Sequence, residues 1–263
     1  MPASPSLLDR RSLLKAASCL PLAAVLANPA LAAAIGKTLE RVSITLPSGK
    51  TVAAALALPQ ADAQPAPGII LVHEWWGLGD QIKAVAGELA RLGYAALAID
   101  LYDGVVATTP QDARRAMQAV DQAQARETIA AWPDWLADHA ACNGRLASVG
   151  WCFGGGWALD TALAAGLRGA VVYYGNVDRS AQQLAALKGP VLGHFATRDN
   201  WITRDMVEKF QAAMRDAGKE ARVYWYEADH AFANPTGAHY DQPDAQLAWQ
   251  RTLAFFAEIL NPD

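Results

Sequence analysis

Short apolar runs alternate with amphipathic segments along most of the chain, and this alternation is the strongest constraint on its fold. Gly68–His73 and Tyr94–Leu101 are almost continuously apolar, as is typical of strands buried on both faces. Between them, Asp80–Leu92 has apolar residues at helical spacing, and Gly93 follows as a stop signal. Strands that alternate with helices predict a mostly parallel, twisted sheet of about eight strands with helices on both faces.

The same criteria give the remaining elements. Further strands are expected at Arg41–Leu46, Val52–Leu58, Arg145–Cys152, Ala170–Tyr174, Pro190–Phe195 and Ala221–Tyr226. Further helices are expected within Pro110–Ala140 and at Gly154–Ala165, Thr203–Ala217 and Asp244–Leu260. The first two strands flank a turn at Ser48-Gly49 and read as an antiparallel hairpin, and Asn143-Gly144 is expected to turn the chain. No linker or repeat divides the sequence, so residues 35–263 are expected to form one domain.

Composition narrows the class of protein. An apolar share of 52% against 18% charged residues excludes a disordered chain. The 22 basic and 26 acidic residues give a net charge of −4, so we expect no nucleic-acid partner and no general affinity for anionic lipid. Cys142 and Cys152 would lie about 26 Å apart along an extended strand, too far for a disulfide. We expect a compact, monomeric enzyme with two free thiols that acts on a small molecule.

Residues 1–34 have the layout of an export signal. The twin-arginine run Arg10-Arg11-Ser12-Leu13-Leu14-Lys15 precedes an apolar stretch, Ala16–Leu26, and a small-residue exit, Ala30-Leu31-Ala32. The paired arginines favour the Tat export machinery as a transient partner. Since the apolar stretch is shorter than the roughly 20 residues of a membrane helix, we expect no stable membrane anchor after cleavage near Ala32. These features predict a periplasmic or secreted protein.

The stretch Gly150-Trp151-Cys152-Phe153-Gly154 has the form G-x-C-x-G between the predicted strand Arg145–Cys152 and the helix that follows. A nucleophile on a sharp strand-to-helix turn occupies a strained backbone conformation, and its neighbours two positions away must be small. Gly150 and Gly154 meet this demand. The turn also places Cys152 at the positive end of the helix, where a thiolate is favoured. The alternative is a buried, inert cysteine in a glycine-rich contact.

A cysteine nucleophile needs a base, and the base needs an acid that orients it. In a sheet of this type the order along the chain is nucleophile, acid and histidine, each just past the carboxyl end of a successive strand. Asp199 follows the predicted strand Pro190–Phe195, and His230 follows Ala221–Tyr226. The sequence therefore predicts a catalytic triad of Cys152, Asp199 and His230.

Other titratable residues compete for these positions. His73 and His194 lie inside apolar strands and are expected to face the core. His239 is a weaker competitor for His230. Asp229 adjoins that histidine in sequence and is expected to be a solvated loop carboxylate pointing away.

An oxyanion formed at an attacked carbonyl needs hydrogen-bond donors. The expected donors are the N–H of Phe153, directly after the nucleophile, and the N–H of Trp75, in the loop after the third strand. Glu74 would then stand near the thiol, where a carboxylate could tune the protonation of the resting sulfur. Further residues near the predicted site loops are expected to line an apolar substrate pocket: Trp76, Tyr102, Trp201 and Asn234.

Together these motifs resemble the dienelactone hydrolase family. The resemblance is carried, in matching order over essentially all of the chain after residue 34, by His73-Glu74-Trp75-Trp76-Gly77, Asp100-Leu101-Tyr102, Gly150-Trp151-Cys152-Phe153-Gly154-Gly155, Asp199 and His230-Ala231-Phe232-Ala233-Asn234-Pro235. It implies an α/β-hydrolase fold with a Cys-His-Asp triad, no cofactor and no metal. It also implies that the glutamate matching Glu74 holds the resting cysteine until substrate displaces it.

The chain departs from this family in one respect. The dienelactone-cleaving members bind the substrate carboxylate with two arginines, one after the Asp-Leu-Tyr segment and one four residues past the histidine. Here these places are held by Asp103-Gly104 and by Asn234. Because two cations are missing where an anion would dock, a neutral ester or lactone is the expected substrate rather than dienelactone itself.

Three functions remain to be separated. The expected one is hydrolysis of a small ester or lactone through an acyl-cysteine intermediate. The alternative is a non-catalytic periplasmic binding protein that retains the hydrolase pocket. A thiol redox protein is disfavoured because the sequence contains no C-x-x-C motif.

Overall fold

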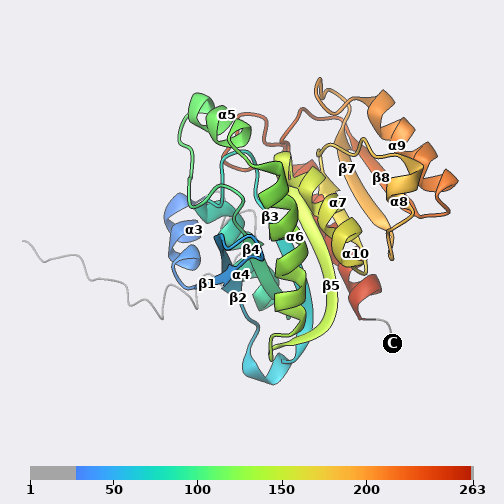
Figure 1. Cartoon of the computed structure of the whole chain (residues 1–263). Coiled ribbons are helices and arrows are strands. Elements are labelled where there is room, and N and C mark those ends of the chain that lie inside the picture. The colour runs from blue at the N-terminus through green and yellow to red at the C-terminus, as the bar shows by residue number, and fades with distance from the viewer. Residues whose placement is uncertain (1–27, 262–263) are drawn as a thin grey trace, which may run out of the picture.

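The computed structural model describes residues 28–261, and Figure 1 draws the other residues in grey. The twin-arginine run and the apolar stretch of the predicted export signal lie outside the described residues. The strands are β1 (Glu40–Thr45), β2 (Thr51–Ala57), β3 (Ala66–Val72), β4 (Ala95–Ile99), β5 (Cys142–Trp151), β6 (Ala170–Tyr173), β7 (Val191–Ala196) and β8 (Ala221–Tyr226). The helices are α3 (Pro29–Gly36), α4 (Asp80–Arg91), α5 (Pro110–Gln118), α6 (Gln122–Ala137), α7 (Phe153–Ala165), α8 (Ala181–Leu184), α9 (Arg204–Asp216) and α10 (Gln242–Leu260), with a short 3₁₀ turn at Ala61–Ala63.

The eight strands form one sheet in the order β1-β2-β4-β3-β5-β6-β7-β8 (Figure 1). The hairpin of β1 and β2 is antiparallel, and β2 also runs antiparallel to β4. All the pairs from β4 to β8 are parallel. The predicted α/β architecture, with about eight strands and an N-terminal hairpin, is therefore confirmed.

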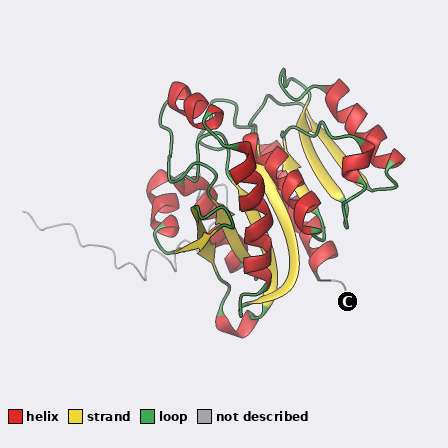
Figure 2. Ribbon diagram, viewed as in Figure 1, coloured by secondary structure: helices red, strands yellow, loops and turns green. Residues whose placement is uncertain are grey.

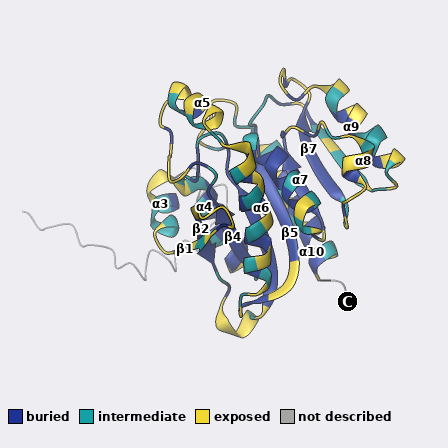
Figure 3. Cartoon of the chain, viewed as in Figure 1, coloured by how far each residue is buried: buried dark blue, intermediate teal, exposed yellow. Residues whose placement is uncertain are grey.

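Both faces of the central strands are buried, which explains the continuous apolar runs. In β3, Ile69 and Leu71 belong to one core cluster and Ile70 and Val72 to the other, and all four are 0% exposed. The first cluster includes residues of α4 and α10, whereas the second includes residues of α6, α7 and α9. Figure 2 shows helices flanking the sheet, and Figure 3 shows central strands that are buried beneath helices with exposed outer surfaces. The carboxyl ends of the parallel strands meet at one edge, where the predicted site residues follow.

Strand β5 begins earlier than predicted. Cys142 already pairs with Ala66, and the register shifts before the next pair, Gly68 with Leu146. Gly144 has a φ of +76° and takes up this irregularity inside the strand. The expectation that Asn143-Gly144 turns the chain was therefore wrong. These two residue types are common in turns, but here they form a bulge within β5. Cys142 and Cys152 are both free thiols, as predicted.

Helix α3 has no counterpart among the predicted elements. The Asn28 side chain caps it by accepting a hydrogen bond from the Leu31 N–H (3.2 Å), and the helix packs against α4. Ala32 is only 4% exposed, because it lies within the core cluster on that face. The predicted cleavage site after Ala32 thus falls inside α3. Between residues 28 and 261, no helix has both the length and the apolar character needed to cross a bilayer.

Candidate active site

Cys152 occupies the sharp turn between β5 and α7. Its φ of 54° and ψ of −118° are strained for a residue with a side chain. A Cβ atom at Gly150 would lie 2.0 Å from the carbonyl oxygen of Gly154, and one at Gly154 would lie 2.3 Å from the carbonyl oxygen of His73. Neither position could hold another residue without moving the backbone. The turn therefore has the conformation that the G-x-C-x-G pattern predicts, with the thiol partly exposed.

The three predicted triad residues lie in one chain of hydrogen bonds. His230 Nε2 is 3.1 Å from Cys152 Sγ, and His230 Nδ1 is 2.6 Å from Asp199 Oδ2. The other carboxylate oxygen, Asp199 Oδ1, accepts from the backbone N–H groups of Trp201 (2.8 Å) and Ile202 (3.0 Å). The acid is thus fixed by its own loop, and it in turn fixes the imidazole against the sulfur.

The charges of His230 and Asp199 follow from the same hydrogen bonds. Burial opposes protonation of His230, but the hydrogen bonds to Asp199 and Cys152 outweigh it and raise the pKa of the imidazole to about 10. Burial also favours neutral Asp199, but the hydrogen bonds from His230 and the Ile202 N–H outweigh it and lower the pKa of this carboxyl. The imidazole, in an environment that favours its protonated form, therefore lies between the Asp199 carboxyl group and the Cys152 sulfur.

Glu74 is buried beside these hydrogen-bonded residues, and its own hydrogen-bond partners are neutral. Asn234 Nδ2 donates to its Oε2 (2.6 Å), and the Tyr174 hydroxyl donates to its Oε1 (3.3 Å). Burial raises the pKa of Glu74 to about 7, although these hydrogen bonds and the charge of His230 lower it in part. Glu74 therefore lies where the sequence places it, within electrostatic reach of the triad, and its charge changes near neutral pH.

Tyr174 is a residue that the sequence did not single out. It stands just past β6 with a φ of 37°, and its ring centroid lies 5.2 Å from that of His230. In sequence it resembles the last residue of a buried strand, and no sequence pattern indicates its hydrogen bond to Glu74, 100 positions earlier. Asn234, predicted to line the pocket, is 3% exposed and uses its amide nitrogen on Glu74.

The other predicted pocket residues differ in exposure. Trp75 and Trp76 are half-buried with ring centroids 4.9 Å apart. Tyr102 is 5% exposed and packs against His73 (4.6 Å between centroids), and its hydroxyl has no hydrogen-bond partner among the described residues. Trp201 is 72% exposed and meets the His230 ring edge-on at 5.0 Å. Of these side chains, Trp201 is the one that contacts a triad residue, whereas Tyr102 packs against Phe153, next to Cys152.

Two cavities contain residues next to the site in their linings. One of about 660 Å³ lies beside Tyr102 and is also lined by the exposed Val105 and Val106. Another of about 440 Å³ lies between α4 and α10, with Trp151 and Tyr173 in its lining. Neither lining includes Cys152, Asp199 or His230, but the first cavity adjoins Tyr102, whose ring centroid lies 5.3 Å from that of Phe153, the residue directly after Cys152.

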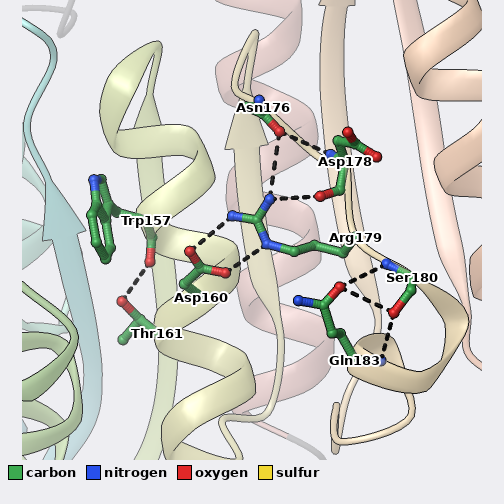
Figure 4. A network of polar contacts seen from close by, with 8 residues as sticks. All are labelled: Trp157, Asp160, Thr161, Asn176, Asp178, Arg179, Ser180 and Gln183. Atoms are coloured by element: carbon green, nitrogen blue, oxygen red, sulfur yellow. Dashed lines mark hydrogen bonds and ion pairs between the residues drawn. The ribbon is translucent and has the colours of Figure 1, made fainter. Parts of the chain in front are cut away.

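An ion pair holds the loop that carries Tyr174. Arg179, in the loop between β6 and α8, donates through Nε and an Nη nitrogen to both oxygens of Asp160 on α7, each at 2.8 Å (Figure 4). Arg179 also donates to the carbonyl oxygen of Asp178 (2.9 Å), and a capping box of Ser180 and Gln183 starts α8. The loop after β6 is thus tied to α7, the helix that begins directly after Cys152.

The competing residues are not part of the hydrogen bonds that join Cys152, His230 and Asp199. His73 and His194 are fully buried, as predicted. Asp229 pairs with Arg198 through a side chain that is 43% exposed, and His239 lies 4.0 Å from the same carboxylate, at 62% exposure. Within residues 28–261, no three histidine, cysteine or acidic side chains lie close enough to hold a metal ion.

Comparison with known proteins settles the family. The model of the dienelactone hydrolase family matches residues 52–260. The chain belongs to this family. Dienelactone hydrolase family membership makes it a hydrolase, so the alternative of a non-catalytic binding protein is not favoured.

Individual relatives agree with this assignment. Carboxymethylenebutenolidase of Pseudomonas putida is 29% identical over 231 residues, which are 84% of this chain and 97% of that protein. Carboxymethylenebutenolidase 1 of Cupriavidus pinatubonensis is 25% identical over 85% of this chain and 98% of that one. The crystal structure of a dienelactone hydrolase candidate from Klebsiella pneumoniae, 30% identical, covers 84% of this chain and 99% of that one with a TM-score of 0.74. A dienelactone hydrolase-like promiscuous phosphotriesterase from metagenomic libraries, 23% identical with a TM-score of 0.76 and a cover of 85% of this chain and 99% of that one, has the same fold.

Proposed function

We propose that this hydrolase cleaves a small ester or lactone through a Cys-His-Asp triad. The observation that carries the proposal is the unbroken chain of hydrogen bonds from Cys152 Sγ through His230 to Asp199. In it the nucleophile, the base and the orienting acid each touch the next, which is the arrangement that nucleophilic acyl transfer needs.

The reaction has two steps. The Cys152 sulfur attacks the carbonyl carbon, and the negative charge that develops on oxygen is held by the N–H groups of Phe153 and Trp75. The C–O bond then breaks, the leaving alkoxide takes the proton from His230, and an acyl-cysteine remains. Water, deprotonated by His230, attacks this thioester and releases the acid and the thiolate. Each side chain needed for these transfers already lies in hydrogen-bond reach of the next.

The two cysteines provide a matched test of this mechanism. Cys152→Ala and His230→Ala should each lower kcat/KM for a short aryl ester by about 10³-fold or more, because nucleophile and base act as one unit. Cys142→Ala, which removes a buried thiol outside the triad, should leave the rate unchanged. Mass spectrometry of the quenched wild-type enzyme should find the acyl group on the peptide that contains Cys152. Full hydrolysis by either triad variant would exclude the mechanism.

We further propose that the substrate is neutral around the acyl group. Asn234 stands where an arginine would meet a substrate carboxylate, and its amide is bonded to Glu74 instead. Asp103, at the other position, is exposed and pairs with Lys50 (2.8 Å). Glu74 would then act as the group that tunes the thiol. A neutral lactone compared with its carboxylate-bearing counterpart is the pair of substrates that tests this.

Export through the Tat route to the periplasm, or out of the cell, is also a proposal. It is supported by the twin-arginine run Arg10-Arg11, the apolar stretch after it and the small-residue exit at Ala32. Fractionation of a bacterial expression host should find the protein outside the cytoplasm with a shortened N-terminus. The double variant Arg10→Lys/Arg11→Lys should stay inside at full length. A wild-type protein that remains cytoplasmic and uncut would refute the proposal.

A further inference from the structure

His73 is a fully buried histidine that the mechanism above does not use. It directly follows β3, and both of its ring nitrogens are bonded to the backbone. Nδ1 lies 2.6 Å from the carbonyl oxygen of Glu74, and Nε2 lies 3.1 Å from the backbone nitrogen of Leu101. The ring thus joins the loop after β3 to the loop after β4, beside the triad.

The position of its proton follows from these partners. The backbone N–H of Leu101 can only donate, so Nε2 must be the unprotonated acceptor. Burial lowers the pKa of His73, although the bond to Glu74 and the charge of Asp100 act in the opposite direction, so the ring is neutral. Its single proton is therefore on Nδ1, and it is donated to the carbonyl oxygen of Glu74.

That carbonyl belongs to the peptide group whose N–H is the expected oxyanion donor. In a planar trans peptide the C=O and N–H bonds point in opposite directions, so holding the Glu74 oxygen also aims the Trp75 N–H. The bond from His73 holds this oxygen from one side, and the Gly77 N–H adds a second bond at 3.1 Å across the turn. The Trp75 N–H is thereby directed away from the His73 ring.

His73 also contacts the segment that carries the other expected donor. Its ring stacks on Phe153, with 5.8 Å between centroids and 20° between planes. The backbone of His73 lies directly against Gly154, where even a Cβ atom would come within 2.3 Å of the His73 carbonyl oxygen. One buried residue thus touches both chain segments whose amides would meet the substrate oxygen.

We propose that His73 is a positioning residue for the oxyanion-binding amides. It orients the Glu74–Trp75 peptide group through its Nδ1 proton and supports the first turn of α7 through its ring face. It neither contacts substrate nor exchanges a proton during the reaction. This inference rests on the proposed function, since it concerns the oxyanion formed when Cys152 attacks.

Two substitutions isolate the hydrogen bonds. His73→Leu fills the buried site without a donor or an acceptor. His73→Gln carries a donor and an acceptor on one amide carbon, with the same 1,3 relation as the two imidazole nitrogens, so it can bond both Glu74 and Leu101. We expect His73→Leu to lower kcat for a neutral aryl ester by about 10²-fold with little change in KM, as losing an oxyanion donor does. His73→Gln should restore about tenfold or more of that loss.

A second readout separates orientation of the amides from general damage. Alkylation of Cys152 by iodoacetamide breaks a C–I bond at a saturated carbon and forms no oxyanion, so its rate reports only the thiolate and its access. This rate should stay within about twofold of wild type in both variants. Should His73→Leu fail to fold, as judged by its circular dichroism, His73→Asn takes its place, with one amide too short to bond both loops and the same loss of kcat expected.

The outcomes distinguish this inference from the proposed function. An unchanged kcat in His73→Leu, or alkylation that slows in step with kcat, would overturn the role of His73 while leaving the triad intact. A wild-type enzyme without esterase activity, or a Cys152→Ala variant that retains it, would instead remove the proposed function on which the inference rests.

Discussion

Among single side chains, Glu74 is one whose charge depends strongly on its surroundings. Its pKa is raised from the usual 4.5 to about 7 by burial, and its two bonded partners, Asn234 and Tyr174, are neutral. The folded protein therefore binds this proton more tightly than the unfolded chain does. The resulting contribution to stability is complete below pH 4.5 and is lost as the pH rises to about 7.

Glu74→Gln should remove this pH dependence. At about 1.4 kcal/mol per unit of pKa, the free energy of unfolding of the wild type should fall, relative to the variant, by about 3 kcal/mol between pH 4.5 and pH 8. Urea unfolding of both proteins at the two pH values measures the difference. The exposed Glu227→Gln serves as the control and should follow the wild type at every pH. Parallel pH curves for Glu74→Gln and wild type would mean that Glu74 ionises normally.

At the level of helices and loops, the Arg179–Asp160 pair decides how the loop after β6 sits on α7. Both side chains are mostly buried, at 18% and 22% exposure, and the pair has two parallel hydrogen bonds. The loop it holds begins with Tyr174, which contacts both Glu74 and His230. Loss of this ion pair should therefore lower both the stability of the fold and the catalytic rate.

Arg179→Ala should lower the free energy of unfolding by about 1–3 kcal/mol, because it leaves a mostly buried Asp160 without its cation. A reduction of kcat by a few-fold should accompany it as Tyr174 loses its anchor. Thermal unfolding and ester hydrolysis measure the two effects. Lys209→Ala breaks an ion pair whose partners are 74% and 73% exposed, and it should change neither. Equal effects of the two substitutions would contradict the structural role of the buried pair.

The elements themselves were largely predictable. Buried strands such as β3 and β4 give runs without polar residues, and helices such as α4 give a clear apolar stripe ending at a glycine. Helix α3 was not predictable, because its alanine-rich sequence is also that of an export signal. Helix α8 has only 4 residues, too few for a periodic pattern. The start of β5 was misplaced because a bulge at Gly144 uses the residues of a turn.

Over the whole chain, the order of residues along the sequence predicts some contacts of the candidate site and not others. That Cys152, Asp199 and His230 lie close together was predictable, because parallel strands bring their carboxyl ends to one edge of the sheet. The contacts of Glu74 with Asn234, 160 positions away, were not, because they depend on how loops fold after leaving the strands. His73 was expected in the core and is there, yet its two backbone bonds have no sequence pattern.

The charge of the whole molecule bears on which substrates it accepts. The chain has a net charge of −4, and the two arginine positions of dienelactone-cleaving relatives are not arginine here. A carboxylate-bearing lactone thus lacks a charge-assisted hydrogen bond that would contribute about 1.5–3 kcal/mol, or roughly 10- to 100-fold in kcat/KM. The carboxylate-bearing lactone therefore has no such advantage here, so its neutral counterpart should be cleaved at least as fast, and added salt should weaken any repulsion of the anion by the net negative charge. Steady-state kinetics at two ionic strengths measures both, and faster cleavage of the anion would contradict the proposal.

The strain at Cys152 lies in the main chain. Gly150 and Gly154 permit the turn, and the φ of 54° at position 152 is set by the way β5 meets α7. The atom that the turn displays can therefore change while the turn stays the same. A serine would occupy the bend as readily as Cys152, whereas any larger residue at either glycine would force the two segments apart. In evolution or engineering, a single substitution at position 152 can therefore change the chemistry of this enzyme. Substitutions at Gly150 or Gly154 would instead disrupt the turn itself.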